Sequence, residues 1–426
     1  MLNDRKASGT ESNGKTSPHA AASSPLRVCI LGHGLTSGGG RTVGKNLIPA
    51  LGRMAPQHEY LITLPAGLGF EQVCRNIPHR QTCIYERRGL FRRWFDETFV
   101  LPKAVRAFRP DVILALADRG LTDPPCPQAI LVHRAQLFYP PKHYAADTWK
   151  NRTLFHYHAR HLRKALRRTD LLLCQTPVGE RRLRQTYGYA GRTAVVPSPV
   201  SRFAIEGDVH LEMPPVLRPY ADCFRLFCPS FYYGHKNLEA AVELFRRFRD
   251  ELRDVVVVMT VAPEQHRHAP RFLRAIRRFG LQDHVLNVGP LPQEHLAAYY
   301  RNVHALFMPT LLESFGLPYL EAMHFGVPIL TSDLDFAREV CGDAAIYFDP
   351  WNPASVKDAV LRLKQNPALA EQLAAKGRAR LKTMFKSWDE VARQVADLLA
   401  ELVRTRKDQG AACAATSSHA GDAATP

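Results

Sequence analysis

Short apolar segments alternate with amphipathic stretches along most of the chain. Apolar runs bounded by glycine, proline or polar residues predict buried strands. In the first half, such runs lie at residues 26–31, 60–64, 111–116, 129–132 and 171–174. The stretches between them have the spacing of amphipathic helices, the first of them at 41–53. Because the two patterns alternate, we predict a parallel sheet covered by helices on both faces.

A second series of the same kind begins near residue 224. Its predicted strands lie at 224–228, 255–261, 285–288, 305–310 and 327–331, and its predicted helices at 237–250, 270–279 and 293–301. Residues 206–222 mix prolines with charges and predict a linker. We therefore expect an α/β protein with two Rossmann-like parallel-sheet domains, at 25–205 and 223–385, facing each other across a cleft. Such a cleft is a preferred place for a ligand.

The two ends of the chain have different patterns. Residues 1–24 are polar, lack the apolar segment of a signal peptide and predict a disordered tail. Residues 387–404 predict an amphipathic helix, with an apolar stripe at Val391, Val395, Leu398, Leu399 and Leu402. Residues 407–426 are rich in alanine, serine, threonine and glycine, and we expect them to remain unfolded.

The formal net charge of +17 is concentrated in the first half. Residues 87–95 interleave arginines with aromatic side chains, and residues 152–184 are rich in arginine. This combination favours binding to an anionic membrane surface. A solvated basic face without a partner and a nucleic-acid-binding surface are the alternatives. No RNA-binding signature accompanies the charge, so nucleic acid is not the expected partner.

The nine cysteines and the apolar segments bear on location. No cysteines form a C-x-x-C pair, and most lie in apolar strand-like contexts, which indicates reduced core residues. No apolar run is long enough to cross a bilayer. We expect a cytoplasmic location, with peripheral attachment to the inner face of the membrane as a further hypothesis.

Candidate chemistry is concentrated between residues 313 and 321. Glu313 follows the predicted strand at 305–310, and Glu321 lies in the apolar-periodic stretch after Pro318. Ligands bind at the carboxyl ends of strands in open α/β sheets, and a helix N-terminus binds anions. Carboxylates beside such a site accept hydrogen bonds from hydroxyls, so the pattern favours a nucleotide-sugar. Two solvated glutamates on an ordinary helix are the alternative.

The segment Glu-Ser-Phe-Gly-Leu-Pro-Tyr-Leu-Glu at 313–321, followed by Gly-Val-Pro at 326–328, resembles a family signature. It is similar to the Glu-x7-Glu motif of the family-4 retaining, or group 1, glycosyltransferases. The resemblance implies the two-domain GT-B fold, a nucleotide-diphospho-sugar donor, no cofactor and no catalytic metal. It also implies that the helix at 386–406 returns to the N-terminal domain.

The resemblance assigns roles to residues of the motif and to two residues before the predicted helix at 237–250. Glu313 would contact donor-sugar hydroxyls, and Glu321 the donor ribose. The diphosphate would be held by Lys236 and by the amides of Ser314, Phe315, Gly316 and Leu317. The family often has an arginine beside this lysine; here His235 or those amides would have to replace its charge. An exposed loop lysine is the alternative for Lys236.

Further candidates lie at predicted strand ends. His133 resembles a family histidine near the reaction centre, with a structural histidine as the alternative. Gly39 and Gly40 resemble a glycine-rich turn facing the donor, with a plain structural turn as the alternative. Residues 39–46 also approach a P-loop, but Asn46 stands where that motif needs serine or threonine. Gly289 and Pro290 lie where the family holds the nucleobase.

Asp333 and Asp335 imitate a D-x-D metal motif. They lead into a predicted helix start, so we expect no metal there.

The combined hypothesis is a retaining, metal-independent hexosyltransferase, with mannose among the candidate sugars. The donor would be a UDP- or GDP-sugar, and the acceptor a saccharide or a lipid-linked precursor of the cell envelope. A nucleic-acid-binding protein with a degenerate sugar-transferase fold remains an alternative, as does a phosphorylase or epimerase of the same fold.

Overall fold

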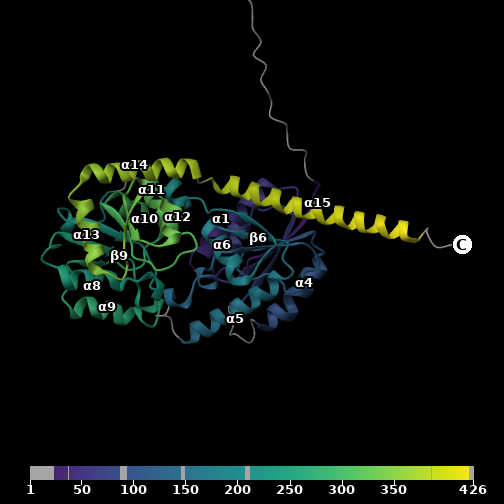
Figure 1. The fold of residues 1–426 in the computed structure, drawn as a ribbon, viewed down its shortest axis with the longest axis horizontal. Helices are drawn as coiled ribbons and strands as arrows, with labels where there is room; N and C mark the ends of the chain where they lie inside the picture. Colours follow the sequence, from purple (N-terminus) through teal and green to yellow (C-terminus); the bar gives the residue numbers. More distant parts are fainter. Residues whose placement is uncertain are drawn as a thin grey trace, which may run out of the picture.

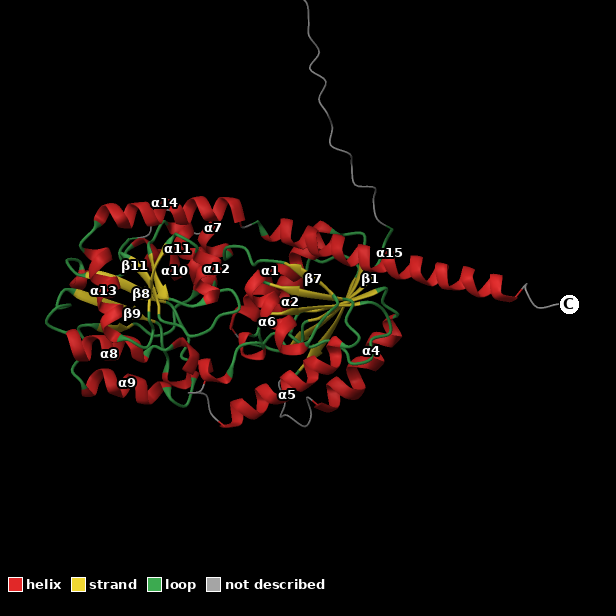
Figure 2. Ribbon diagram, viewed as in Figure 1, coloured by secondary structure: helices red, strands yellow, loops and turns green. Residues whose placement is uncertain are grey.

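The computed structural model describes residues 24–36, 38–86, 94–144, 149–206, 212–384 and 386–421. They form two lobes, each built around a parallel sheet with helices on both faces (Figure 1; Figure 2). The predicted α/β class with two parallel-sheet domains is therefore confirmed. The predicted N-terminal tail and most of the arginine-rich segment at 87–95 lie outside the described residues. None of the described helices has the length and apolarity needed to cross a membrane.

The N-terminal sheet has seven strands in the order β3-β2-β1-β4-β5-β6-β7. The strands are β1 (Arg27–Leu31), β2 (Glu59–Pro65), β3 (Arg80–Tyr85), β4 (Val112–Ala115), β5 (Gln128–Val132), β6 (Leu171–Cys174) and β7 (Arg192–Val195). One face packs on α1 (Gly38–Met54) and α2 (Phe70–Cys74). The other packs on α4 (Leu101–Phe108), α5 (Trp149–Leu166) and α6 (Pro177–Tyr187).

The C-terminal sheet has six strands in the order β10-β9-β8-β11-β12-β13. They are β8 (Phe224–Cys228), β9 (Val255–Met259), β10 (Val285–Asn287), β11 (Ala305–Met308), β12 (Ile329–Ser332) and β13 (Ala345–Phe348). One face packs on α8 (Glu239–Phe248), α9 (Ala269–Arg278), α13 (Pro353–Lys364) and α14 (Pro367–Met384). The other packs on α10 (Gln293–Arg301), α11 (Leu317–Phe325) and α12 (Asp335–Cys341).

The last helix, α15 (Trp388–Gly421), returns to the N-terminal lobe and lies along it (Figure 1). Its apolar stripe, including Val391, Val395 and Leu399, is buried in the core that α1 shares with the first sheet. The helix extends past the predicted end at 404 and through residues 407–421, which the composition predicted to be unfolded. That prediction was wrong because it gave too little weight to alanine, the strongest helix former, which recurs in this segment.

Three strands were not predicted from the pattern: β3, β7 and β13. All three lie at the edge of a sheet. An edge strand has a neighbouring strand on one side only, so its side chains can remain accessible; in β3 every side chain is exposed or half-buried. Pairing with the neighbouring strand, rather than local pattern, defines β3 and β7, whereas β13 is a short apolar run that the prediction missed.

The chain passes to the C-terminal lobe earlier than the predicted boundary at residue 205. The short helix α7 (Arg202–Glu206) contacts α10 and α11, both of the second domain. Its Ala204 is buried in a core cluster with residues of those helices, which explains why the segment belongs with the second lobe.

Candidate active site

The carboxyl ends of strands from both sheets meet at the boundary between the lobes. From the N-terminal sheet, the segments that follow β5 and β6 contact the C-terminal domain. From the C-terminal sheet, the loops that follow β8, β11 and β12 receive these contacts. Ligand sites in open parallel sheets form at this edge.

Lys236 and Glu313 form an ion pair at this boundary. Lys236 ends the short 3-10 helix η5 (Gly234–Lys236) after β8, and Glu313 follows β11. The Lys236 Nζ atom lies 2.5 Å from Glu313 Oε1, and the two side chains are only 18% and 13% exposed. The sequence predicted both residues as site residues but not that they would pair. In this structure the carboxylate of Glu313 therefore balances the charge of Lys236.

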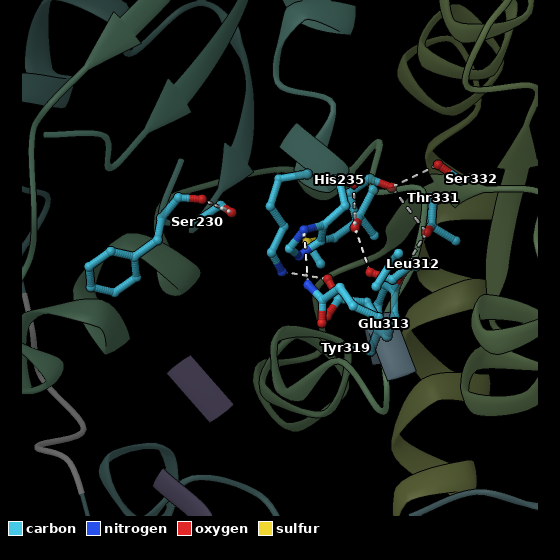
Figure 3. A network of polar contacts seen from close by, with 12 residues as sticks. Ser230, His235, Leu312, Glu313, Tyr319, Thr331 and Ser332 are labelled. Atoms are coloured by element: carbon cyan, nitrogen blue, oxygen red, sulfur yellow. Dashed lines mark hydrogen bonds and ion pairs between the residues drawn. The ribbon is translucent and has the colours of Figure 1, made fainter. Parts of the chain in front are cut away.

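His235 joins the two loops that carry this pair (Figure 3). Its backbone oxygen accepts hydrogen bonds from Leu311 N at 2.7 Å and from Thr310 Oγ1 at 3.2 Å. Burial, aided by the charge of Lys236, lowers the pKa of His235 to about 3. The imidazole is therefore neutral near pH 7 and cannot supply the second positive charge suggested for it. The amides of the following helix are the remaining candidates.

Helix α11 begins at Leu317, and Gly316 precedes it with a φ of 89°. A Cβ atom on Gly316 would lie 2.6 Å from the ring of Tyr319, so both the backbone angle and the close approach require glycine. The first N–H groups of a helix have no partner in its own turns, and the helix dipole favours an anion there. Ser314 and Phe315 lead into this N-terminus, so the predicted phosphate-binding segment has the expected backbone form.

Glu321 lies inside α11 and is 6% exposed. Its Oε1 accepts a hydrogen bond from Ser201 Oγ at 2.6 Å, and its Oε2 accepts one from Tyr300 OH at 2.8 Å. Both carboxylate oxygens are therefore engaged by the protein. Ser201 and Tyr300 are functional candidates that the sequence did not reveal. A ribose would have to share or replace these contacts.

The burial of Glu321 predicts a pH dependence of stability. Desolvation raises its pKa above the ordinary value of 4.5, although both hydrogen bonds oppose this. The folded state then binds its proton more tightly than the unfolded chain. The free energy of unfolding should therefore fall as pH rises from 4.5 through the raised pKa.

Position 321 cannot titrate in the variant Glu321→Gln, so its contribution to the pH dependence of the free energy of unfolding disappears. We expect the Tm of the variant, relative to the natural chain, to increase with pH across that window, measured by calorimetry in a series of buffers. A difference that is constant with pH would contradict this account of Glu321.

His133 follows β5 and lies beside Asp118, which follows β4. The backbone N–H groups of His133 and Arg134 donate to Asp118 Oδ1 at 2.7 and 2.9 Å. The imidazole Nε2 lies 3.6 Å from Asp118 Oδ2. Burial lowers the pKa of His133 in spite of this carboxylate, which favours the neutral imidazole. Asp118 was not predicted, although its place after a predicted strand was a signal that could have identified it.

The three glycines at 38–40 form the first turn of α1 rather than a loop before it. The structure brings Gly40 against His133, as a Cβ atom on Gly40 would lie 2.3 Å from Nε2 of the imidazole. At Gly39 the same atom would meet nothing within 4 Å. The P-loop alternative does not fit, because residues 39–46 are helical and Lys45 lies over the ring of Phe70.

Gly39 and Gly40 provide a matched test of this contact. Gly40→Ala should destabilise the protein by about 1–3 kcal/mol, since the imidazole of His133 has to move. Gly39→Ala should leave stability unchanged or raise it by up to about 1 kcal/mol, because alanine favours a helix. Calorimetric unfolding of both variants measures the difference. Equal stability of the two would show that His133 adjusts without cost.

The predicted nucleobase turn and a surface cavity both lie apart from the ion pair. The turn at Gly289 and Pro290 follows β10, which is separated from β8 by β9. Gly289 has a φ of 74°, and a Cβ atom there would meet nothing within 4 Å. A cavity of about 410 Å³ opens elsewhere in the C-terminal domain, with Arg338, Arg362 and Lys376 in its lining, and contains neither Lys236 nor Glu313.

The two aspartates of the D-x-D motif are both bound by arginines. Asp333 pairs with Arg338 at 2.5 Å, and Asp335 pairs with Arg182 at 2.6 Å. Among the described residues, no group of three or more His, Cys, Asp or Glu is arranged to hold a metal ion. The structure thus gives both carboxylates a partner within the protein.

The C-terminal domain, which carries these loops, matches a known family. Residues 224–380 match the family model described as "Glycosyl transferases group 1". This span contains Lys236, Glu313 and Glu321 and covers the C-terminal domain from β8 into α14. The predicted resemblance to the group 1 glycosyltransferases is therefore confirmed over this domain, and the two-sheet architecture is the GT-B fold.

A curated relative of the chain is also a glycosyltransferase by name. Over 107 residues the chain is 34% identical to O-antigen chain mannosyltransferase B of Escherichia coli, a match covering 25% of this chain and 28% of that protein. The chain thus spans less than a third of this relative's length.

Solved structures share the fold over most of the chain. Sucrose-phosphate synthase from Thermosynechococcus elongatus has a TM-score of 0.66 at 18% identity, covering 89% of this chain and 100% of that one. Anabaena Alr3699/HepE in complex with UDP-glucose has a TM-score of 0.65 at 15% identity, covering 88% and 100%. At these identities, the likeness establishes the fold.

Proposed function

We propose that this chain is a glycosyltransferase that moves a hexose from a nucleotide-diphospho-sugar to a saccharide acceptor. The observation that carries the proposal is the pairing of Lys236 with Glu313 beside the N-terminus of α11, inside the segment that matches the family model. Mannose is the favoured sugar because a relative is named a mannosyltransferase. UDP and GDP both remain candidate nucleotides; the structure of HepE, which shares the fold, is a complex with UDP-glucose.

In the proposed reaction, the bond between the anomeric carbon and the diphosphate oxygen breaks, and negative charge develops on the departing phosphate. Lys236 and the amides that begin α11 stabilise this charge without a metal, in the manner of an oxyanion hole. The acceptor hydroxyl attacks the same face of the sugar, so configuration is retained, and its proton passes to the departing phosphate. Glu313 orients donor-sugar hydroxyls once the diphosphate has replaced it as the partner of Lys236.

Thermal-shift measurements with UDP, GDP and their sugars test the proposal. A nucleotide at 100 times its Kd should stabilise the chain by roughly 2.7 kcal/mol. Transfer of the sugar to a saccharide without any use of free phosphate would exclude the phosphorylase alternative. Conversion of the donor sugar into its epimer, without transfer, would instead favour the epimerase alternative. Salt-dependent binding of an oligonucleotide, without any response to sugar nucleotides, would favour the nucleic-acid-binding alternative.

We further propose a lipid-linked acceptor reached at an anionic membrane surface. Trp94, Phe95 and Phe99 are exposed and contact one another at the start of the segment that leads into α4. On the same face of the sheet, α5 contains no acidic residue. Its exposed bases, together with those just after it, are Arg152, Arg160, Arg163, Lys164, Arg167 and Arg168. Aromatic and basic side chains on one face suit a membrane interface.

Sedimentation with vesicles tests this acceptor surface. The chain should sediment at low salt with vesicles that contain phosphatidylglycerol but not with pure phosphatidylcholine vesicles. Phe99→Ala should weaken sedimentation, whereas Phe231→Ala, which changes an exposed phenylalanine of the C-terminal domain, should not. Equal sedimentation with both kinds of vesicle, or none, would contradict the surface.

A further inference from the structure

The segment between β5 and α5 crosses to the C-terminal domain. Residues 134–144, here named the bridge segment, contain two short 3-10 helices, η2 (Ala135–Leu137) and η3 (Pro141–Tyr144). Phe138, Tyr139 and His143 are buried, and the apolar cluster that holds Tyr139 continues into the second lobe. The bridge segment therefore belongs by sequence to one lobe and packs against both.

Three side chains of the bridge segment each contact a different loop of the C-terminal sheet. Gln136 Nε2 lies 3.4 Å from His235 Nδ1, in the loop after β8. His143 Nδ1 lies 3.0 Å from the carbonyl oxygen of Leu311, in the loop after β11. Since a carbonyl oxygen only accepts, this contact requires the proton of His143 on Nδ1.

The third contact differs from the other two because it involves charged groups, the carboxylate of Asp335 and the guanidinium of Arg182. Tyr139 OH donates to Asp335 Oδ1 at 2.9 Å, after β12. Arg182 of α6 donates to the other oxygen of Asp335 at 2.7 Å, and its guanidinium lies 4.1 Å from the centre of the Tyr139 ring. Tyr139 is thus held in place by Asp335 on one side and Arg182 on the other.

Two of these loops carry the proposed catalytic pair. His235 directly precedes Lys236, and Leu311 lies two positions before Glu313. Leu311 N also donates a hydrogen bond to the backbone oxygen of His235, so the two loops are in direct contact. A side chain that fixes Leu311 or His235 therefore also limits where the ammonium and the carboxylate can lie.

We propose that the bridge segment positions the Lys236–Glu313 pair, with Gln136 and His143 as positioning residues that act through the loops after β8 and β11. The effect of the bridge segment on catalysis rests on the proposed function, but its effect on the position of the two loops does not. If the bridge segment only packed the two lobes together, loss of any one contact would affect all three loops alike. Positioning requires that each contact controls its own loop.

Hydrogen exchange of the ligand-free chain tests this assignment loop by loop. His143→Ala should speed exchange of amides at 309–317 by about two- to tenfold, the factor expected for one net hydrogen bond. His143→Asn should restore much of the protection, because its amide nitrogen can take the place of Nδ1. His295→Ala, at an exposed position on α10, is the matched control and should change nothing in this loop.

A second variant keeps the test independent of how well His143→Ala folds. Gln136 is half-buried, so Gln136→Ala should fold, and it should speed exchange at 233–238 more than at 333–338. Tyr139→Phe should have the opposite pattern. Unchanged exchange at 309–317 in a folded His143→Ala variant, or equal changes in all three loops for every variant, would overturn the proposal.

The catalytic readout is release of nucleoside diphosphate from UDP-glucose and GDP-mannose. His143→Ala should lower kcat by about tenfold with little change in KM, because the pair is misplaced more than the donor is lost. His143→Asn should recover most of the rate. If the natural chain consumes neither donor, the proposed function fails, while the exchange pattern still decides whether the bridge segment positions the loops.

Discussion

Replacing Lys236 with alanine is expected to slow release of the nucleoside diphosphate by about ten- to a hundredfold. A charge-assisted hydrogen bond to the departing phosphate contributes roughly 1.5–3 kcal/mol, and the variant loses it. It also leaves the Glu313 carboxylate without the ammonium that lies 2.5 Å away in the natural chain. An unpaired anion would then repel the diphosphate, so the effect should lie toward the upper end of that range.

A second substitution separates these two causes. Lys236→Ala combined with Glu313→Gln removes the repulsion as well, and should recover part of the donor affinity without recovering the full rate. Lys382→Ala, at an exposed position on α14, is the control for removal of a lysine. Steady-state assays of the four proteins measure the effect. A Lys236→Ala rate equal to that of the control would mean that the diphosphate binds elsewhere.

Replacing Glu321 with alanine should lower the free energy of unfolding by about 2–4 kcal/mol. The substitution leaves the hydroxyls of Ser201 and Tyr300 buried without their acceptor, and these residues are 3% and 0% exposed. For a domain of this size each kcal/mol corresponds to roughly 2–4 °C in Tm. Urea unfolding measures the change, with Glu371→Ala on the exposed face of α14 as the control.

The same position distinguishes a structural carboxylate from a ribose-binding one. If Glu321 acts mainly through its two protein partners, Tyr300→Phe and Glu321→Ala should be strongly coupled in a double-mutant cycle, by about 0.5–3 kcal/mol. Glu321→Gln should then retain affinity for UDP or GDP. A Gln variant that unfolds normally but has lost its nucleotide affinity would instead support the role implied by the family resemblance.

The sequence predicted those parts of the fold that a pattern of neighbouring residues determines. Central strands such as β8 and β11 are apolar runs, and the helix that begins at Leu317 is preceded by glycine with proline in its first turn. The edge strand β3 has no such pattern, because its side chains are exposed or half-buried and pairing with β2 defines it. The prediction missed β13 although its sequence is apolar. The length of α15 was misjudged for a different reason, since alanine-rich composition was interpreted as disorder.

The same division applies to the site. Lys236 and Glu313 could be found because each follows an apolar strand, and parallel strands bring such positions to one edge. Their ion pair could not be found, since either side chain could equally have faced solvent. Ser201 lies 120 residues from Glu321, and a single serine in a proline-rich segment carries no pattern that points to its partner. His235 was one of two candidates for a second positive charge, because sequence does not show the burial that lowers the pKa of this histidine.

The most direct test of the central claim is a crystal structure of the chain with the sugar nucleotide that gives the largest thermal shift. We expect the diphosphate within hydrogen-bonding distance of Lys236 Nζ and of the amides that begin α11, with the sugar beside Glu313. A nucleotide whose phosphates instead lie in the cavity lined by Arg338, Arg362 and Lys376, with the Lys236–Glu313 pair undisturbed, would contradict it.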